Sequence, residues 1–158
     1  MTLVPIAVIG LIGALSLAPM AQSDSAAAAF ARQLADRSPK HDGAPLRTYA
    51  LLDLDKNGHF EVLECVSAFE ATPGFLNVEL EAAFEWINVY AFGEGGFKDR
   101  TASYHQFLTR RKEHYLFWLR VIESPAVLSP DSRSLVEANR EKFRTILRGY
   151  IKRIETSQ

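Results

Sequence analysis

The segment from residue 53 to residue 64 constrains this chain more than any other. It reads Asp-Leu-Asp-Lys-Asn-Gly-His-Phe-Glu-Val-Leu-Glu, with oxygen-bearing side chains recurring along it and Gly58 near its middle. Short carboxylate and amide side chains at alternate positions can converge on one point, and Gly58 allows the left-handed backbone that folds the segment back. Such oxygens suit a hard cation such as calcium. The segment therefore predicts a tight, metal-binding loop.

The same twelve residues resemble the calcium loop of the EF-hand superfamily. In that loop, positions 1, 3, 5, 7, 9 and 12 supply oxygens, and position 6 is a glycine. The resemblance implies calcium as cofactor and six ligand residues: Asp53, Asp55, Asn57, His59, Glu61 and Glu64. His59 would act through its backbone carbonyl, and Glu64 would swing back from a following helix to give both carboxylate oxygens. The alternative interpretation is an acidic turn that precedes a helix and binds nothing.

Apolar residues at helical spacing lead us to expect an all-α fold: an EF-hand-like helix-loop-helix pair with additional C-terminal helices. The expected helices are 46–52, a helix from Val62 to about residue 72, 77–91, 103–122 and one starting at Ser129. Residues 95–106 resemble a second loop that has lost its ligands. We therefore expect a degenerate second hand within 76–108, with an unrelated helix-loop-helix as the alternative.

The N-terminal segment is apolar, since residues 3–20 carry no charge. An uncharged run followed by small residues predicts a secretory signal peptide within residues 1–23, although no Lys or Arg precedes the run. A periplasmic or secreted protein is the expectation. The alternative is an uncleaved membrane anchor, because a span needs about 20 residues. We expect 24–45 to be a linker with an N-terminal helix, 46–108 the EF-hand region, and 109–158 a helical extension packed on it.

Charge is distributed unevenly along the chain. Residues 1–97 carry a net charge of −7 and residues 98–158 a net charge of +6, which together give −1. A self-solvated basic half is one interpretation. The other is a membrane-anchored interaction protein whose basic C-terminal helix docks on lipid or on an anionic partner. Cys65 is the single cysteine, so no internal disulfide can form.

The sequence lacks the patterns of several functional classes. It contains no phosphate-binding glycine loop, no nucleophile elbow and no acid–base pair outside residues 53–64. The mixture of cations and aromatics in 110–118 is only a weak nucleic-acid signal. We therefore expect an exported calcium-binding protein that is not an enzyme, that acts by calcium-dependent stabilisation or partner binding, and that does not bind nucleic acid. The sequence does not identify a protein partner.

Overall fold

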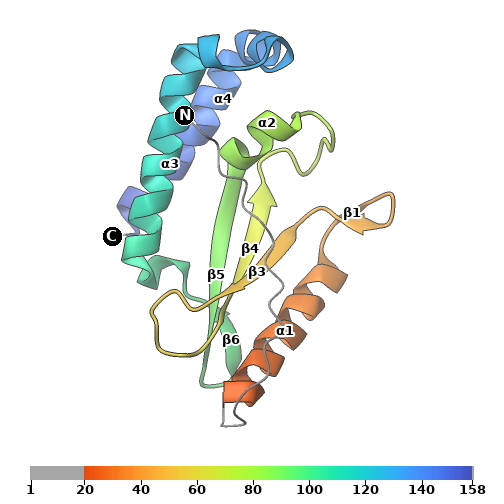
Figure 1. Ribbon diagram of the computed structural model, residues 1–158, viewed down its shortest axis with the longest axis vertical. Helices are drawn as coiled ribbons and strands as arrows, with labels where there is room; N and C mark the ends of the chain where they lie inside the picture. Colours follow the sequence, from red (N-terminus) through yellow and green to blue (C-terminus); the bar gives the residue numbers. More distant parts are fainter. Residues whose placement is uncertain (1–19, 158) are drawn as a thin grey trace.

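The computed structural model describes residues 20–157 and combines helices with antiparallel sheets, so the expected all-α fold is wrong (Figure 1). The larger sheet contains four strands in the order β3-β4-β5-β6, which is also their order along the chain. Their bounds are β3 Thr48–Leu52, β4 Glu61–Ser67, β5 Glu85–Gly93 and β6 Gly96–Asp99. A small separate hairpin joins β1, Lys40–His41, to β2, Ala44–Pro45.

The two helices expected around the loop are strands. Residues 48–52 form β3, and residues 61–67 form β4, which pairs antiparallel with it from Thr48 opposite Cys65 to Leu52 opposite Glu61. The loop thus closes a β-hairpin instead of linking two helices. β4 lies between β3 and β5, and its first four residues are buried. Its buried positions include Glu61 and Glu64, so β4 lacks the alternation of polar and apolar residues that marks a half-exposed strand, and the spacing of its apolar residues also fits a helix.

The helix expected at 77–91 is also largely a strand. Only α2, Val78–Glu81, and a 3₁₀ turn, Ala82–Phe84, are helical before β5 begins. The glycine-rich stretch that follows is the turn between β5 and β6, where Gly95 and Gly96 have φ of +83° and +103°. Residues 76–108 therefore contain a β-hairpin in place of the degenerate second hand.

Two long helices fill the C-terminal part, as the sequence predicts. α3 spans His105–Glu123 and α4 spans Pro130–Thr156, and the two helices pack against each other beside the sheet (Figure 1). A 3₁₀ turn, Thr101–Ser103, precedes α3, and another, Pro125–Val127, separates the two helices. Ser129 caps α4 by accepting a hydrogen bond from the Ser132 amide, and proline occupies the first turn.

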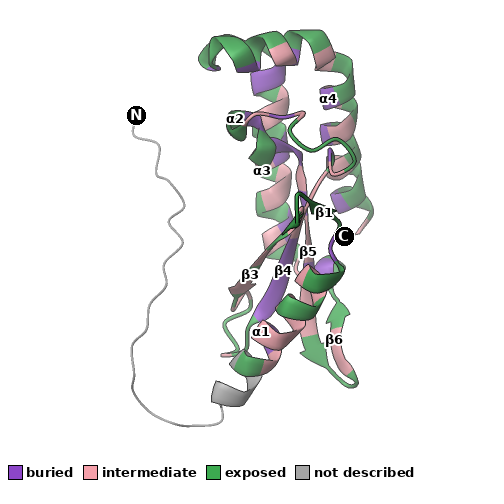
Figure 2. Ribbon diagram, turned by 90° about the vertical axis from the view of Figure 1, so that its right-hand side faces the viewer, coloured by how far each residue is buried: buried purple, intermediate pink, exposed green. Residues whose placement is uncertain are grey.

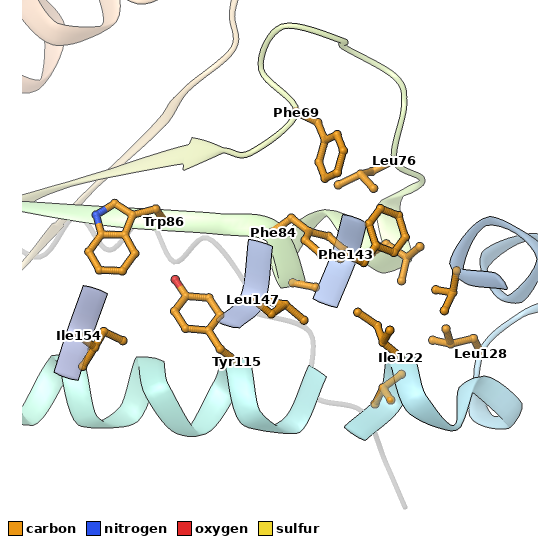
Figure 3. Close-up of a cluster of buried hydrophobic side chains, with 14 of the residues drawn as sticks. Phe69, Leu76, Phe84, Trp86, Tyr115, Ile122, Leu128, Phe143, Leu147 and Ile154 are labelled. Carbon is orange, nitrogen blue, oxygen red and sulfur yellow. The ribbon is translucent and has the colours of Figure 1, made fainter. Parts of the chain in front are cut away.

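The main core lies between this helical pair and the beginning of β5, together with the segment that precedes β5 (Figure 3). Phe69, Phe84 and Phe143 form its aromatic centre, with ring centroids 4.5 to 5.8 Å apart. Tyr115 and Trp86 extend the core along α3 and β5. Aromatic pairs of this kind contribute about 0.5–1.5 kcal/mol each beyond the burial of their area. The core therefore joins the C-terminal helices to the sheet as one packed unit.

The first helix, α1, Met20–Arg37, lies against the other end of the sheet (Figure 1). It contacts β3 and β4, and the Phe30 ring packs on Tyr90 and Phe97 at centroid distances of 5.4 and 4.8 Å. Figure 2 shows how this packing leaves β4 buried over its first half. The predicted signal peptide or anchor lies almost entirely outside the described residues. Within residues 20–157, no helix is long and apolar enough to cross a membrane.

Candidate metal centre

The loop between β3 and β4 has a backbone that its own side chains hold in place. Lys56 and Gly58 adopt left-handed conformations, with φ of +61° and +84°. The carboxylate of Asp53 accepts hydrogen bonds from the amides of Asn57 and Gly58, each at 3.0 Å. A side chain at position 58 would be strained at that φ, so the glycine is required for the turn. The predicted tight loop is therefore present, although its flanks are strands.

Three carboxylates converge on this loop. Asp53, Asp55 and Glu61 each offer an oxygen, and these oxygens all lie within 4.8 Å of one another. Calcium–oxygen distances are about 2.3–2.6 Å, so ligands on opposite sides of one ion lie about 5 Å apart. The three carboxylates thus fit a single calcium ion. Among the described residues, no other group of three His, Cys, Asp or Glu side chains is close enough to hold a metal.

Glu61 is the member of this cluster that is removed from water. Glu61 is 3 % exposed, and its Oε2 accepts a hydrogen bond from the Leu54 amide at 2.7 Å. Burial raises the pKa of Glu61, and the charges of Asp55 and Asp53 raise it further. Like charges at this separation disfavour ionisation. A bound cation would offset both the burial and the repulsion.

Asn57 and His59, two further predicted ligand residues, lie in the same loop and are joined to it by hydrogen bonds. The Asn57 side-chain oxygen accepts a hydrogen bond from the His59 amide at 2.7 Å, and its Nδ2 donates to Asp55 at 3.0 Å. The imidazole of His59 is exposed and not needed for a site, because its expected contribution is the backbone carbonyl. The structure brings together the carboxylates of three of the six predicted ligand residues, and Asn57 and His59 as ligands stay a prediction.

Glu64, the sixth predicted ligand, has different partners. Its Oε1 accepts from Arg47 at 3.2 Å and from the Tyr49 hydroxyl at 3.3 Å. Its Oε2 accepts from Asn88 at 3.0 Å and from the Tyr90 hydroxyl at 2.8 Å. Glu64 is not part of the carboxylate cluster; it is the acceptor at the centre of a buried polar network. Its role as the bidentate ligand depended on a helix after the loop, and that helix is absent.

This network is a feature that the sequence pattern did not indicate. Arg47 also makes a bidentate contact with Glu70, at 2.6 and 3.0 Å, which raises the pKa of its guanidinium. The pairs are 15 to 26 residues apart, and they meet because strand register places Tyr49 and Asn88 on either side of Glu64. No local motif signals such contacts. Recognising them requires the pairing of β3, β4 and β5.

A cavity of about 670 Å³ opens beside the loop. Its walls come from the loop, from the β5–β6 hairpin and from Ala26 of α1. Asp55 and Glu61 of the carboxylate cluster form part of its lining, together with four aromatic residues: Phe60, Phe92, Phe97 and Tyr104. Ligand pockets are commonly about 300–1,000 Å³ and mostly apolar with a few polar groups. The carboxylate cluster therefore lies at the edge of a cavity of ligand size.

Comparisons with known proteins find no relative for this chain: no protein-family model matches it, and no curated protein or solved structure is significantly similar to it. Interpretation of the site therefore depends on its own geometry.

Proposed function

We propose that this chain is a calcium-binding protein with one site in residues 53–61, and that it acts by binding rather than by catalysis. The observation that carries the proposal is the convergence of the Asp53, Asp55 and Glu61 oxygens to within 4.8 Å on a loop whose turn is already formed. A preformed loop lowers the entropy cost of gathering the ligands.

The chain supplies fewer oxygens than a complete EF-hand loop. The proposed site has five ligand residues, and Glu64 contributes none, whereas calcium takes 6–8 oxygen ligands. Waters would complete the shell. Affinity depends on the number of charged ligands, so we expect a dissociation constant in the range of extracellular modules, about 10⁻⁴–10⁻³ M. Such affinity suits the exported location that we propose from the apolar residues 3–20.

The ion would act as a clamp on the β3–β4 hairpin. Asp53 directly follows β3 and Glu61 begins β4. One ion bound to both residues would therefore link the two strands at the loop end of the hairpin. Binding only to the folded state stabilises it by RT ln(1 + [L]/Kd), about 2.7 kcal/mol at 100 times Kd. We propose this calcium-dependent stabilisation as the direct effect of the site.

The test is calorimetric titration of the purified, EDTA-stripped chain with calcium and, separately, with magnesium. We expect one site per chain, a preference for calcium, and a loss of affinity of tenfold or more in Asp53→Asn. The matched control is Asp42→Asn, because Asp42 is an exposed aspartate in another turn with φ of +49°. No heat of binding in the unmodified chain, or equal loss in both variants, would refute the proposal.

A second candidate function is docking on an anionic lipid surface, and α3 is the element that favours it. Leu116 and Phe117 are 39 % and 50 % exposed, and exposed Arg110 and Arg120 flank them on the helix. Exposed apolar side chains beside cations are typical of helices that bind at a membrane interface. Co-sedimentation with phosphatidylcholine vesicles, with and without phosphatidylserine, tests this. Equal recovery of Phe117→Ala and the unmodified chain with the anionic vesicles would exclude it.

A further inference from the structure

One wall of the cavity beside the loop is aromatic, and one of its rings packs against α1. Phe97 stacks on Phe30 of α1 at a centroid distance of 4.8 Å, and Phe92 meets its edge at 5.4 Å. Phe92 is nevertheless 66 % exposed, and Phe60 is 36 % exposed. Two aromatic rings thus remain accessible to solvent at a cavity of about 670 Å³. Such rings offer large apolar area at low entropy cost to a ligand.

The charged groups of this cavity have one sign. Asp55 and Glu61 line it, and among the residues that the structure describes no Lys or Arg does. The remaining titratable groups are His59 and Tyr104, and the burial of Tyr104, together with the Glu61 charge, raises the pKa of its hydroxyl. The phenol therefore stays neutral. A ligand that carried negative charge would be repelled by both carboxylates, whereas a cation would be attracted.

We propose that this cavity binds a small organic cation, with an ammonium head group near the carboxylates and an apolar body against the aromatic side chains. Aromatic faces attract ammonium groups through their quadrupoles, most strongly where water is partly excluded. The combination of accessible aromatic rings and uniformly acidic charge is what selects this class of ligand. A neutral ligand would use only the rings, and an anionic ligand would be opposed by the charges.

The proposed calcium site and this cavity share two carboxylates, so their occupants compete. This competition rests on the proposed function; binding of the cation does not. Asp55 and Glu61 belong to both, whereas Asp53 belongs to the carboxylate cluster but does not line the cavity. Calcium would neutralise the charge that attracts the ammonium group. By reciprocity, each ligand should weaken the other by the same factor.

The test is a calorimetric titration of the full chain with benzyltrimethylammonium chloride, in the presence of EDTA and at constant ionic strength. Benzyl alcohol is the neutral comparison and phenylacetate the anionic one. We expect the cation to bind on the order of tenfold more tightly than the alcohol, and phenylacetate not to bind. Equal affinity for the cation and the alcohol would overturn the proposal.

Two variants separate the cavity from the metal site. Phe92→Ala should weaken the cation on the order of tenfold and leave calcium binding unchanged, while Phe117→Ala, an exposed phenylalanine on α3, should change neither. Asp53→Asn should lose calcium, retain the cation and make its affinity insensitive to calcium. Unchanged cation affinity in Phe92→Ala would overturn the proposal, as would calcium and the cation binding without mutual effect. If calcium does not bind the unmodified chain, the proposed function fails, and the EDTA titration still decides the cavity.

Discussion

Glu61 and Glu64 lie three positions apart on β4, and their carboxylates belong to separate clusters on opposite faces of the sheet. Side chains alternate along a strand, so a separation of three residues places them on opposite faces, whereas on a helix it would place them on one face. Glu61 therefore turns to the loop and Glu64 to Tyr49, Asn88 and Tyr90. One glutamate is available to a metal, and the other is fully engaged by protein donors.

The first prediction separates these two glutamates by calcium titration. Glu61→Gln removes one of three converging carboxylates and should lower calcium affinity by tenfold or more. Glu64→Gln should leave calcium affinity within about threefold but lower the melting temperature, because a buried hydrogen-bond network loses its charged acceptor, at a cost of about 1–3 kcal/mol. The reverse pattern would mean that Glu64, and not Glu61, is the calcium ligand.

The loop residues could be predicted from the sequence because their chemistry is local. Asp53, Asn57 and Gly58 form their turn through contacts at most five residues apart. The type of element on each side could not be predicted in the same way. Val62, Cys65, Val66 and Phe69 fit a helical period. β4 buries Glu61 and Glu64 beside its apolar residues, so polar and apolar residues do not alternate along it as they do in a half-exposed strand. The resemblance to an EF-hand loop then favoured the wrong element.

The C-terminal helices, in contrast to the strands, could be predicted from the sequence. α4 begins with Ser129 as cap and Pro130 in its first turn, and an apolar stripe continues over 27 residues, too long for a strand. Residues 85–93 carry a weaker signal. Ile87, Val89 and Tyr90 favour a strand by propensity, yet the surrounding spacing also fits a helix. Only pairing with β4, which lies some 20 residues earlier, resolves that ambiguity.

The second prediction concerns stability against acid. Burial raises the pKa of Glu64, but hydrogen bonds from Asn88, Tyr90 and Arg47 outweigh it, so the pKa is lowered from its ordinary value of 4.5. A lowered folded-state pKa contributes stability that is present above pH 4.5 and is lost as the pH falls through the folded value. The melting-temperature gap between the unmodified chain and Glu64→Gln should therefore be constant near neutrality and shrink below pH 4.5. A gap independent of pH down to pH 2 would contradict this.

Glu61 contributes a pH dependence of stability that is opposite in sign to that of Glu64. Its pKa is raised, so its ionised form destabilises the calcium-free fold, and that cost disappears as the pH falls through the raised value. Measuring both chains in a Glu61→Gln background removes this contribution and isolates Glu64.

The third prediction tests whether the aromatic core holds the molecule together. Phe143 is fully buried and contacts the rings of Phe69, Phe75 and Phe84. Phe143→Ala should lower the free energy of unfolding by about 3–5 kcal/mol, measured by urea denaturation. Phe117→Ala, at a half-exposed position, should stay within about 0.5 kcal/mol. A loss confined to the helical signal, with the sheet unfolding at an unchanged urea concentration, would show that the two parts are independent.

The fourth prediction concerns the part of the β5 edge that no strand within residues 20–157 covers. β6 pairs only with Tyr90–Gly93, and side chains of α3 reach the beginning of β5 instead. The Glu85 carbonyl accepts from the Tyr115 hydroxyl and from Arg111, both at 2.7 Å, and Arg111 also donates to the Tyr115 hydroxyl at 3.0 Å. An edge strand presents unpaired backbone groups. Here α3 supplies the Glu85 carbonyl with two donors, and these donors also bind each other.

Because the three groups form one network, their contributions should not add. Tyr115→Phe should cost about 1 kcal/mol, since Arg111 still reaches the carbonyl. Arg111→Met should cost a similar amount, and the double variant should cost more than the sum, because the Glu85 carbonyl then loses every side-chain donor. Urea denaturation of all four chains gives the coupling energy, expected at about 0.5–3 kcal/mol. Strictly additive losses would show that water replaces either donor, and that the edge of β5 does not depend on α3 for its hydrogen bonds.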